Sequence, residues 1–335
     1  MVSNKPPTFP LARSGAGHAP LRRPGSVRRT TSIESRWPDA SGGNVVMIGR
    51  ARDVATSVEG AAPIVLETGA FRIEASPRRE ILTITTEPDH PRSQELVGVR
   101  AGGASREALM QAMGGMVGAP IYQLLDDYAG ASLISGWILP HWNRGQAREV
   151  RDGEGPPRKG PAINICTGFA EGSSALDALR RPANAAPTRT EVAPLEHPAD
   201  PDGWHEMCGA AGPYTCRARR VDVWADGDSV VVDAGFQDSG QTPDGARIAL
   251  HEYRVHAIVD RGTMVLRSLK VLPLILPFAE CPGAALKASR MVGQPLGEFR
   301  QRVINTLPYA DGCTHLNDVL RSLADVPKLV AKLTA

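Results

Sequence analysis

Two cysteines in the last third of the chain are the residues best placed to do chemistry. One lies in Glu280-Cys281-Pro282-Gly283-Ala284-Ala285, and the other lies in Gly312-Cys313-Thr314-His315-Leu316-Asn317-Asp318. Each is predicted to stand where a helix begins, because proline suits the first turn of a helix and threonine can cap it. The positive end of a helix dipole lowers the pKa of a thiol there. The pattern therefore predicts a metal site or a reactive-thiol site.

His315 lies two residues after Cys313, near enough to share a centre with it. His251 or Glu252, at the start of an expected strand, is predicted to complete the site. Thiolate, imidazole and carboxylate together suit zinc or iron. We therefore expect Cys281, Cys313, His315 and His251 to bind the metal, with His315 and Glu252 as the catalytic groups.

A structural alternative stays open for these residues. Cys281 and Cys313 can be small apolar core residues, and His315 can pair locally with Asp318. The remaining cysteines are predicted to be incidental, with Cys208 open as a substitute ligand; they are Cys166, Cys208 and Cys216.

The first half of the chain resembles the second half without the two cysteines. Val45-Val46-Met47 and Asp53 have the same spacing as Val230-Val231-Val232 and Asp238. Further matches in the same order are Arg28-Arg29 with Arg219-Arg220, Phe71-Arg72-Ile73 with Tyr253-Arg254-Val255, and Gly118-Ala119-Pro120-Ile121 with Gly312-Cys313-Thr314-His315. Matches that keep a common order indicate an internal repeat. We therefore expect the second copy to bind and the first to support it.

The second copy reads as strands followed by helices. Strands are predicted at 219–224, 229–236, 250–259 and 264–272, with turns at Asp226-Gly227-Asp228 and Asp260-Arg261-Gly262. Helices are predicted at 282–292, 296–307 and 314–323, with Thr314 as an N-cap. The fold class is therefore α+β, with two tandem, diverged copies of an antiparallel β-meander followed by helices.

Four segments follow from this pattern. Residues 1–24 form a flexible basic arm, 25–142 a degenerate first repeat, 143–212 a Pro/Gly-rich connector, and 213–335 the repeat with the metal site. Two apolar islands in the connector, 163–169 and 204–208, are expected to pack down, and one hypothesis is that they cover the site.

Composition excludes several classes of partner. The chain of 335 residues has 38 basic and 36 acidic residues, a formal net charge of +2. This balance argues against nucleic acid or membrane surfaces as partners and favours a small-molecule substrate. A homo-oligomer stays open. The basic cluster Arg22, Arg23, Arg28 and Arg29 is interpreted as a solvated arm.

The cysteine count and the opening residues bear on the compartment. The first 24 residues lack the apolar segment of a secretory signal, so a cytoplasmic location is expected. Five cysteines in a reducing compartment indicate free thiols or ligands and not disulfides.

Other candidate motifs are weaker. Asp126-Asp127 resembles a carboxylate pair, but adjacent helical residues point about 100° apart, so a solvated helix end is predicted. The sequence contains no Gly-Lys-Ser/Thr phosphate loop, no Gly-x-Ser-x-Gly elbow and no His-Glu-x-x-His helix.

Four segments together resemble the bacterial family catalogued as domain of unknown function 2889, over most of the chain. They are 22–33, His251-Glu252-Tyr253, Glu280-Cys281-Pro282 and 312–318. This resemblance implies no established activity.

Residues 251–325 are more distantly similar to iron–sulfur scaffold proteins of the NifU/IscU type. On that likeness Cys281 corresponds to the scaffold's middle cysteine, Cys313 to its last, and His251 to the position of its first. A histidine in place of the first cysteine, and His315 after and not before the last one, favour a mononuclear metal over cluster assembly.

We expect a metal-binding protein that is a metal-dependent hydrolase or lyase acting on a small organic acid or ester. The alternatives are a non-catalytic iron–sulfur or sulfur-handling module, and a metal-free enzyme with a cysteine nucleophile. Substrate and metal identity are left open by the sequence.

Overall fold

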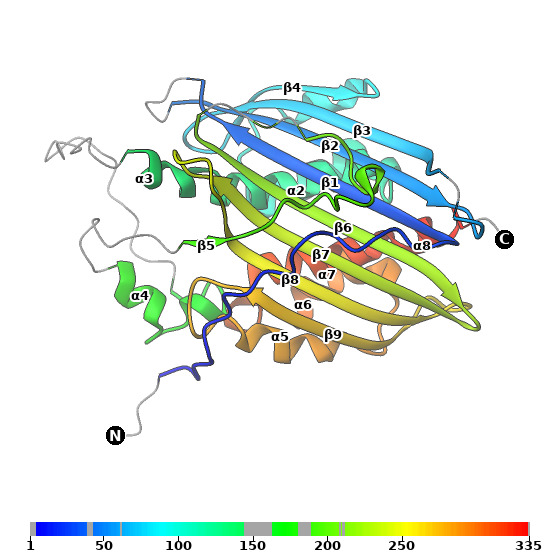
Figure 1. The fold of residues 1–335 in the computed structure, drawn as a ribbon. Coiled ribbons are helices and arrows are strands. Elements are labelled where there is room, and N and C mark those ends of the chain that lie inside the picture. The colour runs from blue at the N-terminus through cyan, green and yellow to red at the C-terminus, as the bar shows by residue number, and fades with distance from the viewer. Residues whose placement is uncertain are drawn as a thin grey trace, which may run out of the picture.

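Two strand meanders, one from each half of the chain, join edge to edge in a single nine-stranded antiparallel sheet (Figure 1). The first has β1 (Ser26–Arg36), β2 (Val45–Thr56), β3 (Ile64–Ala75) and β4 (Ile81–Glu87). The second has β6 (Tyr214–Asp226), β7 (Ser229–Gln241), β8 (Arg247–Asp260) and β9 (Leu266–Ile275), and the short β5 (Thr190–Glu191) pairs with β8. The computed structural model describes residues 5–38, 43–60, 62–143, 163–179, 189–207, 209 and 212–333.

The two halves meet at β1 and β6. These strands pair antiparallel from Ser26 opposite Trp224 to Arg36 opposite Tyr214. The order β4-β3-β2-β1-β6-β7-β8, with β9 next to β8, is therefore mirrored about this central pair. The halves share one sheet, which confirms an α+β fold, whereas the internal repeat stays a prediction that the mirrored order supports.

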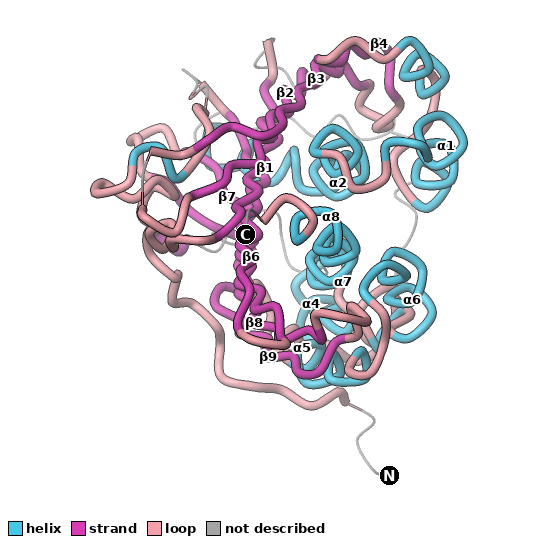
Figure 2. The backbone as a smooth tube through the Cα atoms, turned by 90° about the vertical axis from the view of Figure 1, so that its right-hand side faces the viewer, coloured by secondary structure: helices cyan, strands magenta, loops and turns pink. Residues whose placement is uncertain are grey.

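The helices of both halves cover the same face of the sheet (Figure 2). The first meander is followed by α1 (Gly103–Met113), α2 (Pro120–Ile134) and α3 (Leu139–Trp142). The second is followed by α5 (Gly283–Lys287), α6 (Phe299–Thr306), α7 (Thr314–Ser322) and α8 (Val326–Val330). The connector contributes α4 (Ser174–Leu179). Among the described residues, no helix combines the length and apolar character needed to cross a membrane.

The elements predicted for the second half are confirmed, with shifted ends. All four predicted strands form, and Gly227 has a φ of 60° in the turn between β6 and β7. The predicted helix over 282–292 is divided into α5 and a 3₁₀ turn. The N-cap of α7 is Cys313 and not Thr314.

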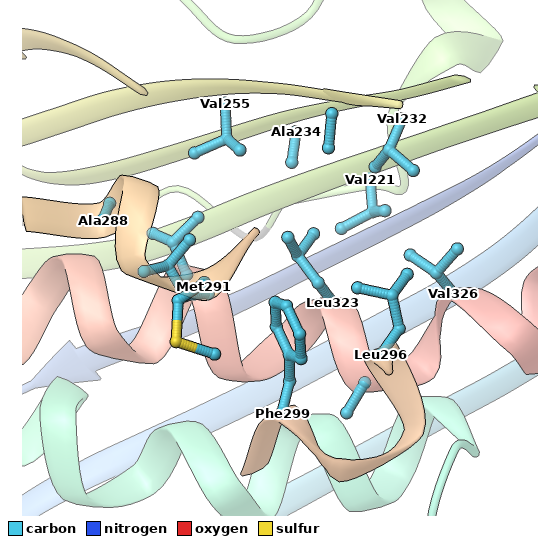
Figure 3. Close-up of a cluster of buried hydrophobic side chains, with 14 of the residues drawn as sticks. Val221, Val232, Ala234, Val255, Ala288, Met291, Leu296, Phe299, Leu323 and Val326 are labelled. Atoms are coloured by element: carbon cyan, nitrogen blue, oxygen red, sulfur yellow. The ribbon is translucent and has the colours of Figure 1, made fainter. Parts of the chain in front are cut away.

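Each half has its own apolar core between sheet and helices. In the second half, valines of β6, β7 and β8 pack against side chains from the segment after α5, from α6 and from α7 to α8 (Figure 3). Residues such as Val232, Phe299 and Leu323 have no exposed surface there. A second cluster unites β2, β3 and β4 with α1 and α2.

A largely buried ionic layer, partly exposed at Arg106, Lys332 and Glu67, separates these two apolar cores along the helix face of the central strands. Its cations are Arg29, Arg106, Arg217, Arg219, Arg300, Arg321 and Lys332, and its anions are Asp53, Glu67, Asp126, Asp127, Asp238, Asp318 and Asp325. Seven basic groups thus face seven carboxylates. Buried charges are tolerated only when they are paired in this way.

This layer corrects two expectations. The solvated basic arm is wrong for Arg28 and Arg29, which lie inside β1 with 1% and 2% exposure. The solvated helix end is wrong for Asp126 and Asp127, which are buried in the middle of α2. Their side chains do diverge, since Asp126 accepts from Arg321 and Asp127 from Arg219.

The opposite face of the sheet is covered by the N-terminal segment and part of the connector (Figure 1). Phe9 donates a backbone hydrogen bond to Ala279, after β9, and Ser14 donates one to Leu274 within β9, so the predicted flexible arm is attached here. Arg22 forms an ion pair with Asp200 of the connector at 2.8 Å. The island at 204–207 packs on this face, whereas Cys208 lies outside the described residues.

His205 from this island inserts between two hydroxyls of β1. Its ring nitrogens lie 2.7 Å from Ser32 Oγ and 2.8 Å from Thr30 Oγ1. Burial lowers the pKa of His205 to about 3. The unfolded chain therefore takes up this proton first when the pH falls below about 6.5, and the folded state loses stability.

Replacing Arg219 with Met should lower the free energy of unfolding by about 3–5 kcal/mol, because Asp127 would be left buried without its partner. The Arg219→Met/Asp127→Leu double variant should recover much of this loss. The exposed Arg302→Met should cost less than about 1 kcal/mol. Urea unfolding measures all three, and equal effects of Arg219→Met and Arg302→Met would contradict the role of the ionic layer.

Between pH 7.5 and 5.5, wild type should lose about 1.4 kcal/mol more stability than His205→Gln, because only wild type carries this linked proton. The comparison requires urea unfolding of both proteins at the two pH values. Parallel pH profiles would show that His205 does not titrate as its burial implies.

Candidate metal centre

Three side chains from three different elements converge beneath the second half of the sheet. Asp238 of β7, His251 of β8 and His315 of α7 each offer a ligand atom, and these atoms lie within 4.8 Å of one another. His251 Nδ1 is 3.2 Å and His315 Nε2 is 3.6 Å from the same oxygen, Asp238 Oδ2. The imidazoles are stacked with ring centroids 3.6 Å apart. Two imidazoles and a carboxylate form a ligand set known for zinc and for non-haem iron.

The sheet places two of the three ligands. Asp238 and His251 are directly opposite each other across β7 and β8, so their side chains project from the same face. The register shifts immediately after this pair, where Ser239 faces Ala249. A bulge of this kind twists a ladder locally and re-aims the neighbouring side chains.

The third ligand is placed by the start of α7. Gly312 precedes it and has no room for a side chain, because a Cβ would lie 2.3 Å from the carbonyl oxygen of Leu307. This close approach lets Cys313 act as N-cap and puts His315 in the first turn. Asn317 Nδ2 donates to the same Leu307 oxygen and fixes the loop.

The charge states of His315 and Asp238 suit metal binding. Burial lowers the pKa of His315 well below 6.5, so its ring is neutral at pH 7 and keeps a lone pair. Burial alone would raise the pKa of Asp238, but the Arg217 guanidinium, the hydrogen bond with His251 and the two nearby imidazoles together outweigh it and hold that pKa below its usual range. His315 Nε2 is buried and, among the described residues, has no hydrogen-bond partner.

Arg217 organises the groups behind Asp238. It donates Nε and Nη2 to the two Asp238 oxygens at 2.9 and 3.1 Å, and Nη1 to Asp318 Oδ2 at 3.0 Å. Gly130 of α2 leaves the space for it, because a Cβ there would lie 1.7 Å from Arg217 Nη1. Groups that orient a ligand in this way commonly tune metal affinity.

The predicted thiol ligands lie beside the centre and outside the group of three. Cys313 Sγ is 4.0 Å from His315 Nδ1 and accepts a hydrogen bond from Tyr253 at 3.5 Å. A Cβ on Gly168 would be 2.7 Å from Cys281 Sγ and 3.9 Å from Cys166 Sγ. Cys166, predicted to be incidental, therefore lies near Cys281.

The expectation of low thiol pKa values is wrong. Burial raises the pKa of Cys166 to about 11, and it also raises the pKa of Cys281 and of Cys313. Both Cys281 and Cys313 belong to the apolar core of the second half. Their desolvation outweighs the helix dipole, which is modest for the short α5.

Glu252 is not brought to this centre. Successive residues of a strand point to opposite faces, so Glu252 faces away from His251. Its carboxylate accepts from the backbone of Ala16 at 2.8 Å and from Gln237 at 3.0 Å on the other face of the sheet. Burial raises the pKa of Glu252.

Of the predicted residues, the structure thus unites His251 and His315. The candidate ligand that the sequence analysis missed is Asp238, whose only sequence signal was its equal spacing with Asp53. The predicted local pair of His315 with Asp318 is absent from the described contacts, in which Asp318 bonds Arg106 and Arg217.

The first connector island packs next to the thiols. Thr167 donates its backbone N–H and its hydroxyl to the carbonyl of Gly312, and Ser174 donates to Glu280. Phe169 meets Phe278 edge to face. Residues 163–179 therefore hold the loops that precede α5 and α7. The connector residues 144–162 and 180–188 lie outside the described residues.

In the first half, the position that corresponds to the candidate metal centre is occupied by the ammonium group of Lys332. Asp53 lies directly opposite Arg29 and Glu67, much as Asp238 lies opposite Arg217 and His251. Arg29 grips Asp53 with Nε and Nη2. Lys332 Nζ then lies 2.6 Å from Asp53 Oδ2 and 2.5 Å from Glu67 Oε2. This register corrects the predicted match of Arg29 with Arg220, because Arg217 is its ladder counterpart.

The fold and this site define an α+β protein with a candidate His₂Asp centre in its second half. Residues 215–328 match the family described as protein of unknown function DUF2889. The match runs from β6 into α8 and therefore spans less of the chain than the sequence resemblance implied.

No curated protein and no solved structure matches the chain. The similarity to iron–sulfur scaffold proteins stays a prediction.

Replacing Gly130 with Ala should destabilise the protein by on the order of 3 kcal/mol, although alanine normally favours a helix, because the new methyl displaces Arg217 from two buried carboxylates. The matched control is Gly136→Ala, where no described atom lies within 4 Å. Urea unfolding of both variants tests this, and a stabilised Gly130→Ala protein would show that the Arg217 contacts are dispensable.

Proposed function

We propose that the protein binds one divalent metal ion, zinc or iron, through Asp238, His251 and His315. The observation that carries this proposal is the convergence of three ligand atoms within 4.8 Å, one of them a buried imidazole nitrogen without a partner among the described residues. A neutral imidazole and an ionised carboxylate are the forms that bind metal. An ion held by three protein ligands has an open position for water or substrate.

The first half supports a cation at this position. The oxygen of Asp53 that bonds the Lys332 ammonium is the Oδ2 atom, and in the second half Asp238 Oδ2 faces the imidazoles of His251 and His315 instead. Beyond the strand arginine, which each carboxylate has, a second cation therefore meets the carboxylate in the first half only. A metal ion would supply that charge in the other half.

The proposed reaction is metal-dependent hydrolysis or a lyase step on a small organic acid or ester. A bound ion would polarise a carbonyl oxygen and make a bound water more acidic. The chain itself would hold Asp238 ionised through Arg217, and would keep His315 oriented through contacts of its Nδ1 with Thr314 and Cys313. Since the ionic layer balances without an ion, a divalent charge would favour an anionic substrate nearby.

A metal-free cysteine nucleophile is less well supported, because burial raises the pKa of Cys281 and Cys313 and so disfavours the thiolate. The iron–sulfur alternative is tested by the metal analysis and cobalt substitution described below. Cys281 and Cys313 also stay candidate ligands, as Cys313 is adjacent to His315.

Purified wild type should bind about one equivalent of Zn²⁺ or Fe²⁺, and Asp238→Asn and His315→Gln should each bind at least about 100-fold more weakly, beyond the usual effect of an outer-shell group. His256→Gln is the control, because His256 lies on the other face of the sheet with 39% side-chain exposure. Metal analysis and calorimetry measure these values. Equal metal content in all proteins, or none in wild type, would refute the centre.

Cobalt substitution separates the ligand sets. Cys313→Ser and Cys281→Ser should keep the metal, and Co²⁺-loaded wild type should lack a thiolate-to-cobalt charge-transfer band. A band that disappears in Cys313→Ser would restore the sulfur ligation predicted from the sequence. A brown protein containing iron and sulfide would favour the iron–sulfur module.

A further inference from the structure

A cleft of about 850 Å³ separates the helices of the first half from those of the second. One wall comes from α1 and α2, and the other comes from α6, α7 and the loop between them. Its volume lies within the range of small-molecule sites. The cleft lies beside the start of α7, since Gly312 and Thr314 line it, whereas the three proposed metal ligands do not.

The floor of the cleft offers N–H donors. Arg106, Arg300 and Arg321 line it, and the Nε atom of each is buried without a hydrogen-bond partner among the described residues. Asp126 is shared between Arg300 and Arg321, and Asp318 is shared between Arg106 and Arg217. Each carboxylate thus serves two guanidinium groups. The Nε atoms themselves are enclosed, so an anion in the cleft would meet the outer N–H groups of these guanidinium groups, of which Arg106 is the most exposed at 28%.

The rim of the same cleft is apolar and exposed to solvent. Met110, Ile165, Ile304 and Tyr309 are 47%, 50%, 39% and 78% exposed. Exposed large apolar side chains gathered around one concavity indicate a binding surface more than scattered ones do. Tyr122 adds an aromatic wall and lies under the Arg300 guanidinium, 5.0 Å from its ring centre.

We propose that this cleft binds a small amphipathic anion, a carboxylate or phosphate group joined to an apolar chain or ring. The anionic oxygens would accept hydrogen bonds from Arg106 and Arg300, and the apolar part would cover the rim. Guanidinium groups match both carboxylate and phosphate geometry. Binding of the anion to the cleft does not depend on the proposed metal centre. The inference rests on the proposed function only where the anion is taken to be the substrate of the metal-dependent reaction.

A chain of buried contacts joins this anion site to the candidate metal centre. Arg106 Nη2 is 2.5 Å from Asp318 Oδ1, Asp318 Oδ2 is 3.0 Å from Arg217, and Arg217 holds Asp238. An anion that engages Arg106 weakens its bond to Asp318 and leaves that carboxylate to Arg217. The anion site and the metal ligand are therefore coupled through two side chains.

The experiment uses full-length protein stripped of metal, titrated calorimetrically with benzoate, octanoate and phenyl phosphate, and with neutral benzamide as the counterpart of benzoate. At least one of the three anions should bind, and when it is benzoate, benzamide should bind at least tenfold more weakly. Arg106→Gln should weaken anion binding at least tenfold. Arg302→Gln, on the same helix as Arg300 but outside the cleft lining, should change it less than twofold.

A second variant is needed because Arg106→Gln can weaken binding indirectly, by destabilising the fold. Ile304→Asp alters only the exposed rim and should also weaken anion binding at least tenfold. Failure of all three anions to bind, or equal affinities in Arg106→Gln, Ile304→Asp and Arg302→Gln, would overturn the proposal. Anion binding by a protein that never binds metal would refute the metal centre and leave the cleft assignment intact.

Discussion

The bidentate pairing of a strand arginine with an aspartate on the next strand is the interaction on which this architecture depends. Arg29 with Asp53 and Arg217 with Asp238 bury four charges between the two apolar cores. Each arginine has one further nitrogen, which reaches the C-terminal helical region at Asp325 or Asp318. Strand register and helix position are therefore fixed by the same side chains, because a shift of either would leave a buried charge without its partner.

This constraint also explains why the candidate site lies where it does. A buried carboxylate that already pairs with an arginine stays ionised. Its remaining lone pairs face the neighbouring strand and helix. In the first half Lys332 meets that oxygen, and in the second half two imidazoles do. The same scaffold thus serves as an internal ion pair in one half and as a candidate cation site in the other. The two halves differ in chemistry although their ladders agree.

The cleft adds a place for an organic ligand at the junction of the halves. Arg300 and Arg321 come from the second half and Asp126 from the first, so neither half alone builds its floor. Fusion of both meanders into one sheet is what brings α2 against α7. An anionic ligand and a metal ion would then be linked through Asp318, which lines the cleft, and Arg217, which contacts both Asp318 and the candidate ligand Asp238.

What the sequence determined by itself is the local structure and the side-chain types. The strands β6 to β9, the turn at Gly227 and the helix start after Gly312 were all predicted, because each depends on neighbouring residues. His251 and His315 were likewise identified as candidate ligands. Only the tertiary structure decided that Asp238 joins them, that Glu252 points away and that Cys281 and Cys313 are desolvated. These outcomes depend on strand register and on burial between residues as far apart as 238 and 315, and a linear pattern carries no measure of either. The buried state of Arg29 and Asp126 was undecidable for the same reason, since a charged residue is ordinarily exposed unless distant partners neutralise it.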